Sequence, residues 1–232
     1  MIWNIIFVVL VCLVIVCLWC MIYDSNRFVT VAYEIHSAKL KRDCKILFLS
    51  DLHNKEYGKE NRNLLDAIQK VQPDLILVGG DMMNASPGAD FENAVRFLKK
   101  ISETYPVYYA LGNHEYRSRI YPENYGDMYE RYMEALKDTG IVFLDNQSTY
   151  CEDYSIRVTG LTMDRKYYKR FVKRKMEPGY IQETIGDASE STFQLLLAHN
   201  PEFFADYAAW KPDLVLSGHV HGGVVKVPFW ED

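Results

Sequence analysis

The sequence predicts an α/β protein preceded by one apolar helix. Short apolar runs alternate with stretches that carry apolar residues at three- and four-residue steps, which is typical of strands joined by helices. Several runs are followed within one to three residues by Asp, Asn or His, which places polar groups at the carboxyl ends of strands. The 232 residues, 49% of them hydrophobic, suffice for one large core in one or two domains. The net charge of −5 makes a nucleic-acid partner an unfavoured prediction.

The first part of the chain, residues 2–23, carries no charged side chain and one strongly polar side chain, Asn4. At about 1.5 Å per helical residue it would be about 33 Å long, enough to cross a bilayer core. A cleaved signal peptide needs a basic start and small residues at the cleavage site. No Lys or Arg precedes Arg27, and no Ala or Gly precedes Ala32. We therefore predict an uncleaved transmembrane anchor over residues 1–24 and a single-pass protein of the cell membrane.

The side of the membrane is predicted from the basic residues near this stretch. All of them follow it, namely Arg27, Lys39, Lys41 and Arg42. The positive-inside rule therefore favours a cytoplasmic globular part, although three of the four lie far from the stretch. The globular part contains only Cys44 and Cys151, which form no disulfide framework and do not identify a redox compartment.

The first predicted strand covers residues 28–35, where Val29, Val31, Tyr33 and Ile35 alternate loosely with other residues. We assign residues 25–42 to this strand and its connection. Residues 43–232 form the globular domain in this prediction.

Five further strands are predicted to deliver polar groups at their carboxyl ends. They cover residues 44–50, 74–78, 107–111, 193–198 and 214–216. Amphipathic helices are predicted over residues 61–71 and 91–101, and two more strands over residues 141–144 and 154–161. The candidate site therefore lies where several strands end.

The polar residues at these strand ends supply carboxylate, amide and imidazole groups, which together suit a pair of divalent metals. They are Asp51, His53, Asp81, Asn113, His114, His199, His219 and His221. Neighbouring glycines permit sharp turns at the strand ends. His219 and His221 are two residues apart, so in an extended segment they share one face.

Taken together and in this order, the motifs resemble the calcineurin-like metallophosphoesterase superfamily over roughly residues 45–223. The amino-terminal anchor and the Gly-His-Val-His-Gly-Gly motif resemble its membrane-anchored bacterial branch, which includes phosphodiesterases and enzymes similar to lipid-linked pyrophosphatases. The resemblance implies a four-layer α-β-β-α sandwich of two mixed β-sheets flanked by helices. It also implies two divalent metal ions, with manganese preferred and iron, zinc or cobalt as alternatives.

The resemblance also implies a role for each candidate residue. Asp51, His53, Asp81 and His221 would hold one metal, and Asp81, Asn113, His199 and His219 would hold the other. Asp81 would be the bridge, and His114 would be the catalytic histidine. Two cations about 3.5–4 Å apart can neutralise phosphate charge and lower the pKa of a bridging water for in-line attack. His114 would then assist the leaving group.

One difference from a branch of the superfamily narrows the range of expected substrates. Protein serine/threonine phosphatases carry Gly-Asp-x-x-Asp-Arg-Gly at the second motif, whereas residues 80–85 read Gly-Asp-Met-Met-Asn-Ala. The arginine that would grip a phosphomonoester and the aspartate that would orient the histidine are both missing. We expect hydrolysis of a phosphodiester or pyrophosphate in a lipid- or nucleotide-linked substrate near the membrane. The alternatives are a broad-specificity phosphomonoesterase and a non-catalytic scaffold with the same fold.

Two segments outside the motifs carry open alternatives. Arg165 to Lys175 has only basic charges, interleaved with aromatic residues. It is an amphipathic segment on an anionic membrane, a solvated helix face or a grip for an anionic headgroup. Only residues 224–232 follow the last glycine of the final motif. Because relatives usually continue with further strands, we expect the C-terminal edge to be either truncated or covered differently.

Overall fold

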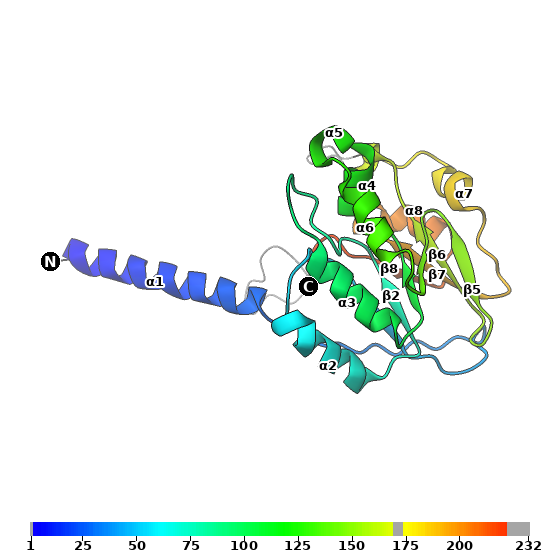
Figure 1. Cartoon of the computed structure of the whole chain (residues 1–232), viewed down its shortest axis with the longest axis horizontal. Helices are drawn as coiled ribbons and strands as arrows, with labels where there is room; N and C mark the ends of the chain where they lie inside the picture. Colours follow the sequence, from blue (N-terminus) through cyan, green and yellow to red (C-terminus); the bar gives the residue numbers. More distant parts are fainter. Residues whose placement is uncertain (1, 169–173, 222–232) are drawn as a thin grey trace.

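Two four-stranded β-sheets pack face to face in the computed structural model, which describes residues 2–168 and 174–221 (Figure 1). The first sheet has the order β1-β2-β3-β4 and is parallel throughout. In the second sheet, β5-β6-β7-β8, only β5 runs antiparallel to its neighbour. The strands are β1 (Ile46–Leu49), β2 (Leu75–Val78), β3 (Val107–Tyr109), β4 (Ile141–Phe143), β5 (Ser148–Cys151), β6 (Ile156–Leu161), β7 (Phe193–Ala198) and β8 (Leu214–Leu216).

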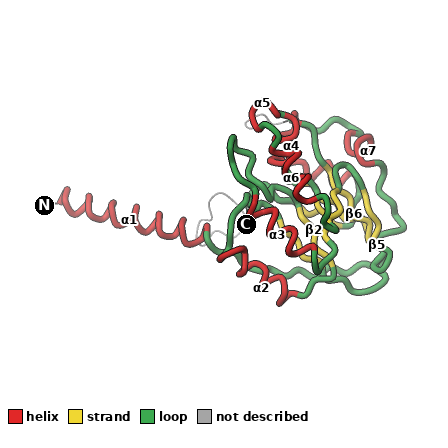
Figure 2. The backbone as a smooth tube through the Cα atoms, in the orientation of Figure 1, coloured by secondary structure: helices red, strands yellow, loops and turns green. Residues whose placement is uncertain are grey.

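Helices cover the two outer faces of this pair of sheets (Figure 2). Helices α2, α3 and α6 pack on the first sheet, and α7 and α8 pack on the second. The predicted α-β-β-α sandwich is therefore confirmed, with the detail that only the second sheet is mixed. The helices are α1 (Ile2–Ser25), η1 (Lys59–Asn61), α2 (Arg62–Val71), α3 (Glu92–Ser102), α4 (Asn113–Ile120), α5 (Pro122–Tyr125), α6 (Met128–Leu136), η2 (Arg165–Tyr168), α7 (Tyr180–Ile185), η3 (Pro201–Phe203) and α8 (Phe204–Ala209).

Strand β2 shows why uninterrupted apolar runs form the middle of this fold. Its residues Leu75 and Leu77 pack between the two sheets, while Ile76 and Val78 pack against the helices of the first sheet. All four are at most 2% exposed, because successive side chains of a strand point to opposite faces and both faces are covered here. The apolar run stops with the strand, so the polar residues that follow it lie at the carboxyl end of the strand.

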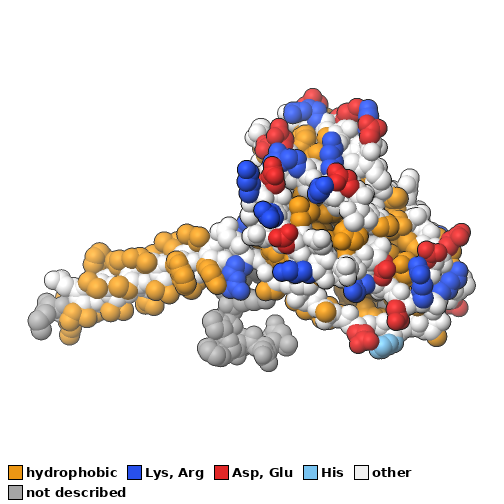
Figure 3. Space-filling view, turned by 60° about the horizontal axis from the view of Figure 1, so that its bottom comes forward, with side chains coloured by type: hydrophobic (Ala, Val, Ile, Leu, Met, Phe, Trp, Pro, Cys, Tyr) orange, Lys and Arg blue, Asp and Glu red, His pale blue; other side chains and the backbone are white. Residues whose placement is uncertain are grey.

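Helix α1 extends away from the globular part, and the side chains of residues 2–23 are exposed (Figure 3). Residues 2–23 have a mean hydropathy of 3.4, and none of this span is buried. By length and composition it is the one helix in the described chain that could cross a membrane. A signal sequence near the N-terminus has the same two properties, so the helix alone does not distinguish an anchor from a leader.

The strand predicted over residues 28–35 is wrong, because these residues form no strand and pair with none in the described part of the chain. Three of the alternating apolar side chains, Val29, Val31 and Tyr33, are 73%, 60% and 87% exposed. An alternating pattern becomes a strand only when a neighbouring strand supplies hydrogen bonds, and here the segment has none. It runs instead beside β1 and lines an apolar groove together with that strand and β8.

The other predicted elements occur, the strands over residues 193–198 and 214–216 with the predicted bounds and the rest with shifted ends. The strand predicted over residues 107–111 ends at Tyr109, and the one predicted over residues 154–161 begins at Ile156. In the basic segment Arg165 to Lys175, residues 165–168 form the short helix η2, residues 174 and 175 are exposed, and residues 169–173 lie outside the described part of the chain. The residues after His221 also lie outside it.

Candidate metal centre

The candidate ligands follow β1, β2, β3, β7 and β8 in the chain, in loops or, for Asn113, at the start of α4, so both sheets contribute to one site. Five of the seven adopt left-handed backbone conformations that non-glycine residues rarely use. Their φ angles are 58° for Asp51, 48° for His53, 54° for Asp81, 72° for His219 and 51° for His221. Such strain clusters at functional sites, because the surrounding structure must impose it. The backbone strain is an observation independent of the sequence motifs, and it occurs at the same residues.

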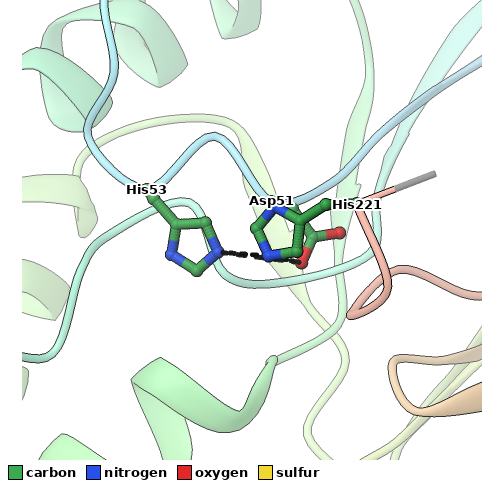
Figure 4. A group of neighbouring side chains, drawn as sticks. All are labelled: Asp51, His53 and His221. Carbon is green, nitrogen blue, oxygen red and sulfur yellow. Dashed lines mark hydrogen bonds and ion pairs between the residues drawn. The ribbon is translucent and has the colours of Figure 1, made fainter. Parts of the chain in front are cut away.

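The first group of converging side chains is Asp51, His53 and His221 (Figure 4). The Nε2 atoms of the two histidines are 3.2 Å apart, and their rings are stacked. Oδ1 of Asp51 lies 3.8 Å from Nε2 of His53 and 3.7 Å from Nε2 of His221. The first and last motifs of the chain therefore meet around one point.

The second group is Asp81, His199 and His219. Oδ2 of Asp81 is 3.1 Å from Nε2 of His199, and the rings of His199 and His219 are 5.3 Å apart between centroids. Asn113, the remaining candidate, begins helix α4 next to this group. The residue after it, His114, donates its backbone N–H to Oδ1 of Asp81 at 2.7 Å.

Asp81 also belongs to a third set of neighbours, with His53 and His114. Its Oδ2 atom is 3.9 Å from Nε2 of each of these two histidines. Asp81 is only 2% exposed and has neighbours from both ligand groups. A carboxylate between two groups of ligands is the arrangement required of a bridging ligand.

Two buried atoms test whether this donor set fits a metal. Oδ1 of Asn113 is buried without a hydrogen-bond partner, and Nε2 of buried His199 faces only the carboxylate of Asp81. A buried polar atom without a partner costs about 1–3 kcal/mol, so native structures rarely leave one without a reason. Nδ1 of His199 faces the carbonyl oxygen of Gly79 at 2.7 Å, so Nδ1 must carry the proton and Nε2 of the neutral ring keeps the lone pair. Oδ1 of Asn113 is thus available as a ligand, Nε2 of His199 becomes one when it loses the proton that faces Asp81, and the set fits divalent cations.

The ionisation of these groups follows from burial and from Asp81. Burial alone would lower the pKa of His199, but the neighbouring Asp81 outweighs it and raises that pKa to about 9. Burial would raise the pKa of Asp81, but His199 and His114 outweigh it and lower that pKa to about 2. Burial also lowers the pKa values of His53 and His219, which favours the neutral imidazole that binds metals.

His114 is oriented by a backbone group. The N–H of Ala85 donates to Nδ1 of His114 at 2.8 Å, so this ring, unlike that of His199, keeps its neutral-state proton on Nε2. Burial lowers the pKa of His114 to about 4, and the positive charge of Arg117 contributes to this shift. The aspartate that is missing from the second motif is therefore replaced by a hydrogen-bond donor.

Glu115 is a site residue that the sequence analysis did not identify. It is fully buried, and its carboxylate accepts hydrogen bonds from the N–H groups of Asp81 and Gly112 at 2.9 and 3.0 Å and from Met82 at 2.9 Å. The hydroxyl of Tyr109 donates to it at 2.7 Å. Burial raises the pKa of Glu115, and these donors oppose that rise. The one signal in the sequence is an acidic residue directly after His114, which by itself indicates no partner.

Two glycines leave room for the carboxylates. A Cβ atom on Gly112 would lie 2.2 Å from Oδ1 of Asp81, and one on Gly218 would lie 2.4 Å from Oδ2 of Asp51. Contacts under 3.0 Å do not occur for real Cβ atoms, so any side chain here would displace a candidate ligand. Both glycines thus serve close approach rather than flexibility.

Comparison with known proteins agrees with this geometry. The profile of a family described as calcineurin-like phosphoesterase matches residues 44–223, most of the chain. An uncharacterized metallophosphoesterase of Campylobacter jejuni is 30% identical over 197 residues, which are 83% of this chain and 48% of that protein. The phosphodiesterase YaeI of Escherichia coli is 30% identical over 188 residues, which are 79% of this chain and 63% of that protein. The protein YpbG of Bacillus subtilis is 25% identical over 206 residues, which are 87% of this chain and 70% of that protein. The chain thus spans about half to two thirds of the length of these relatives.

Proposed function

The chain belongs to the calcineurin-like phosphoesterase family, and from this premise we propose that it hydrolyses phosphoester bonds with two divalent metal ions. The observation that carries the proposal is the convergence of two ligand groups on the shared carboxylate of Asp81. A scaffold without catalysis would not need a buried ligand atom that has no protein partner, such as Oδ1 of Asn113.

In this proposal Asp51, His53 and His221 hold one metal together with Asp81. Asn113, His199 and His219 hold the other, again with Asp81. When bound, the two cations supply Lewis acidity, which neutralises charge on a phosphate group and lowers the pKa of water. A mixed set of carboxylate, amide and imidazole ligands suits manganese, iron, zinc and cobalt. Of these four metals we prefer manganese.

The protein groups have separate tasks. His114 directs the N–H of its Nε2 atom into the centre, where it donates a hydrogen bond to the leaving oxygen of the substrate. The buried carboxylate of Glu115 holds the loops that carry Asp81 and Asn113 at a fixed separation. Neither task requires a covalent bond between the protein and the substrate.

A phosphodiester or pyrophosphate is the preferred substrate. Asn84 and Ala85 stand where protein phosphatases carry the aspartate and arginine that serve phosphomonoester hydrolysis, and the similar protein YaeI is named a phosphodiesterase. We further propose that helix α1 anchors the domain to the cell membrane with the domain on the cytoplasmic side, and that the substrate is lipid- or nucleotide-linked. The full exposure of this apolar helix supports the anchor.

The test compares a chromogenic phosphodiester with the matching phosphomonoester. Manganese-loaded protein, metal-stripped protein and an Asp81→Asn variant are assayed in parallel, with Asp66→Asn as the control at an exposed position. We expect diester hydrolysis that requires metal, is lost in Asp81→Asn and persists in Asp66→Asn. Faster turnover of the monoester would favour a broad-specificity phosphomonoesterase. Two bound metals without turnover of either compound would favour the scaffold.

A further inference from the structure

His114 and Arg117 both hold Ala85, a residue of the loop that follows β2. Nδ1 of His114 accepts the N–H of Ala85 at 2.8 Å, and Nη2 of Arg117 donates to the carbonyl oxygen of Ala85 at 2.9 Å. The two side chains are three positions apart on helix α4 and therefore lie on the same side of it. Because Ala85 is only 2% exposed, water does not readily replace either contact. Helix α4 thus clamps both polar groups of one buried residue.

The direction of the first hydrogen bond determines the tautomer of His114. A backbone N–H can only donate, so Nδ1 must offer its lone pair and the proton of the neutral ring is on Nε2. Nε2 lies 3.9 Å from Oδ2 of Asp81, inside the candidate metal centre. A carboxylate in place of the Ala85 N–H would accept a hydrogen bond from a protonated Nδ1 and leave Nε2 as an acceptor in the neutral ring. The identity of the group at Nδ1 therefore decides what His114 presents to a substrate.

The side chain of Arg117 has few other contacts. Within the described residues it makes no ion pair, and its Nε atom is buried without a hydrogen-bond partner. Its guanidinium lies 5.7 Å from the ring centroid of Tyr125, a contact that limits its motion. By contrast, Arg119 on the same helix pairs with Asp145 and does not contact Ala85.

We propose that Arg117 is a positioning residue for the reaction. By holding the carbonyl group of Ala85, it keeps the N–H of Ala85 directed at Nδ1 of His114. The Nε2–H of His114 then stays directed at the leaving oxygen. This inference rests on the proposed function, because it assumes that His114 assists a leaving group.

The kinetic test varies the leaving group of the substrate. Wild type, Arg117→Ala and Arg117→Lys hydrolyse methyl 4-nitrophenyl phosphate and methyl phenyl phosphate, and Arg119→Ala is the matched control. For Arg117→Ala we expect kcat to fall about 10- to 100-fold with the phenyl diester, which needs help at its leaving oxygen, and about threefold or less with the nitrophenyl diester. KM should change by about twofold at most. Arg117→Lys should recover part of the loss, because its ammonium group can also donate to Ala85.

A second readout follows the tautomer directly. In zinc-loaded full-length protein with ¹⁵N-labelled histidine, the Nδ1 signal of His114 should be that of an unprotonated nitrogen. The signal is assigned by its loss in His114→Gln. In Arg117→Ala it should move toward the average of the two tautomers, and in Arg119→Ala it should not move.

Two results would overturn the role of Arg117. One is an equal fall in kcat for both diesters, as a general loss of structure would cause. The other is an unchanged Nδ1 signal in Arg117→Ala. If the wild type hydrolyses neither diester, the proposed function fails instead, and the Nδ1 signal alone then decides whether Arg117 positions the ring.

Discussion

The carboxylate of Asp51 accepts the backbone N–H of His219, with 3.0 Å between the nitrogen and each carboxylate oxygen. The two residues are 168 positions apart, and they follow β1 of the first sheet and β8 of the second. This hydrogen bond ties the sheets together without any metal. Because hydrogen bonds to charged groups contribute about 1.5–3 kcal/mol, we expect Asp51→Ala to lower the free energy of unfolding of the metal-free protein by about that amount. Urea unfolding in the presence of a chelator measures the change. An Asp51→Ala variant as stable as the wild type would show that the contact contributes nothing.

Replacing Glu115 should weaken the centre without removing a ligand. The carboxylate only accepts hydrogen bonds. In Glu115→Gln the amide N–H₂ group would face backbone N–H groups, and because both can only donate, hydrogen bonds would be lost. We expect manganese affinity and kcat/KM to fall about 10- to 100-fold, as for other partners of metal ligands. Calorimetric titration with manganese measures the affinity. Glu130→Gln, at an exposed position, should leave both quantities unchanged, and equal behaviour of the two variants would contradict the role of Glu115.

The glycine at position 112 should not tolerate even a methyl group. In Gly112→Ala the new Cβ would meet Oδ1 of Asp81, so that Asp81 must move and metal affinity must fall. Gly140→Ala is the matched control, because a Cβ there meets nothing within 4 Å. The metal content of each purified variant provides the measurement. Wild-type metal content in Gly112→Ala would show that the loop adjusts without loss.

Leu98 on helix α3 is fully buried against the first sheet. Leu98→Ala should therefore lower the free energy of unfolding by about 2–5 kcal/mol through lost burial and the cavity left behind. Val142→Ala on the edge strand β4 should cost far less, because its side chain is 41% exposed. Denaturant titrations of both variants in the metal-loaded state make the comparison, and similar losses would mean that α3 packs less tightly than it does in this structure.

The thiol of Cys44 should lose its proton only at unusually high pH. Burial, with the negative charge of Asp74, raises its pKa from the ordinary value of 9.0 to about 12. The folded state then keeps the proton while the unfolded state loses it, so this group lowers stability as pH rises from about 9 toward 12. In native protein the alkylation rate of Cys44 should keep rising above pH 9, whereas in denatured protein it should level off near pH 10. Mass spectrometry of the modified peptide follows both rates, and a plateau in the native protein at pH 9 would contradict the raised pKa.

The sequence predicted the fold best where a continuous apolar run marked a buried strand. Continuous apolar runs such as residues 75–78 predicted buried strands, and the polar residues directly after them lie together in the structure. The strand predicted over residues 28–35 was wrong because alternation reports an exposed and a covered face but not the presence of a partner strand. Sequence also could not reveal the partner of Nδ1 in His114, since that partner is a backbone N–H whose position depends on tertiary structure. For the same reason the role of Glu115 became visible only once two loops were seen around it.

The left-handed conformations of Asp51, His53, Asp81, His219 and His221 limit which residues could replace these candidate ligands. Asp, Asn and His tolerate a positive φ better than most residues, whereas a β-branched side chain there is a steric outlier. Each of these positions is therefore restricted twice, by the group its side chain offers to the centre and by the conformation of its own backbone.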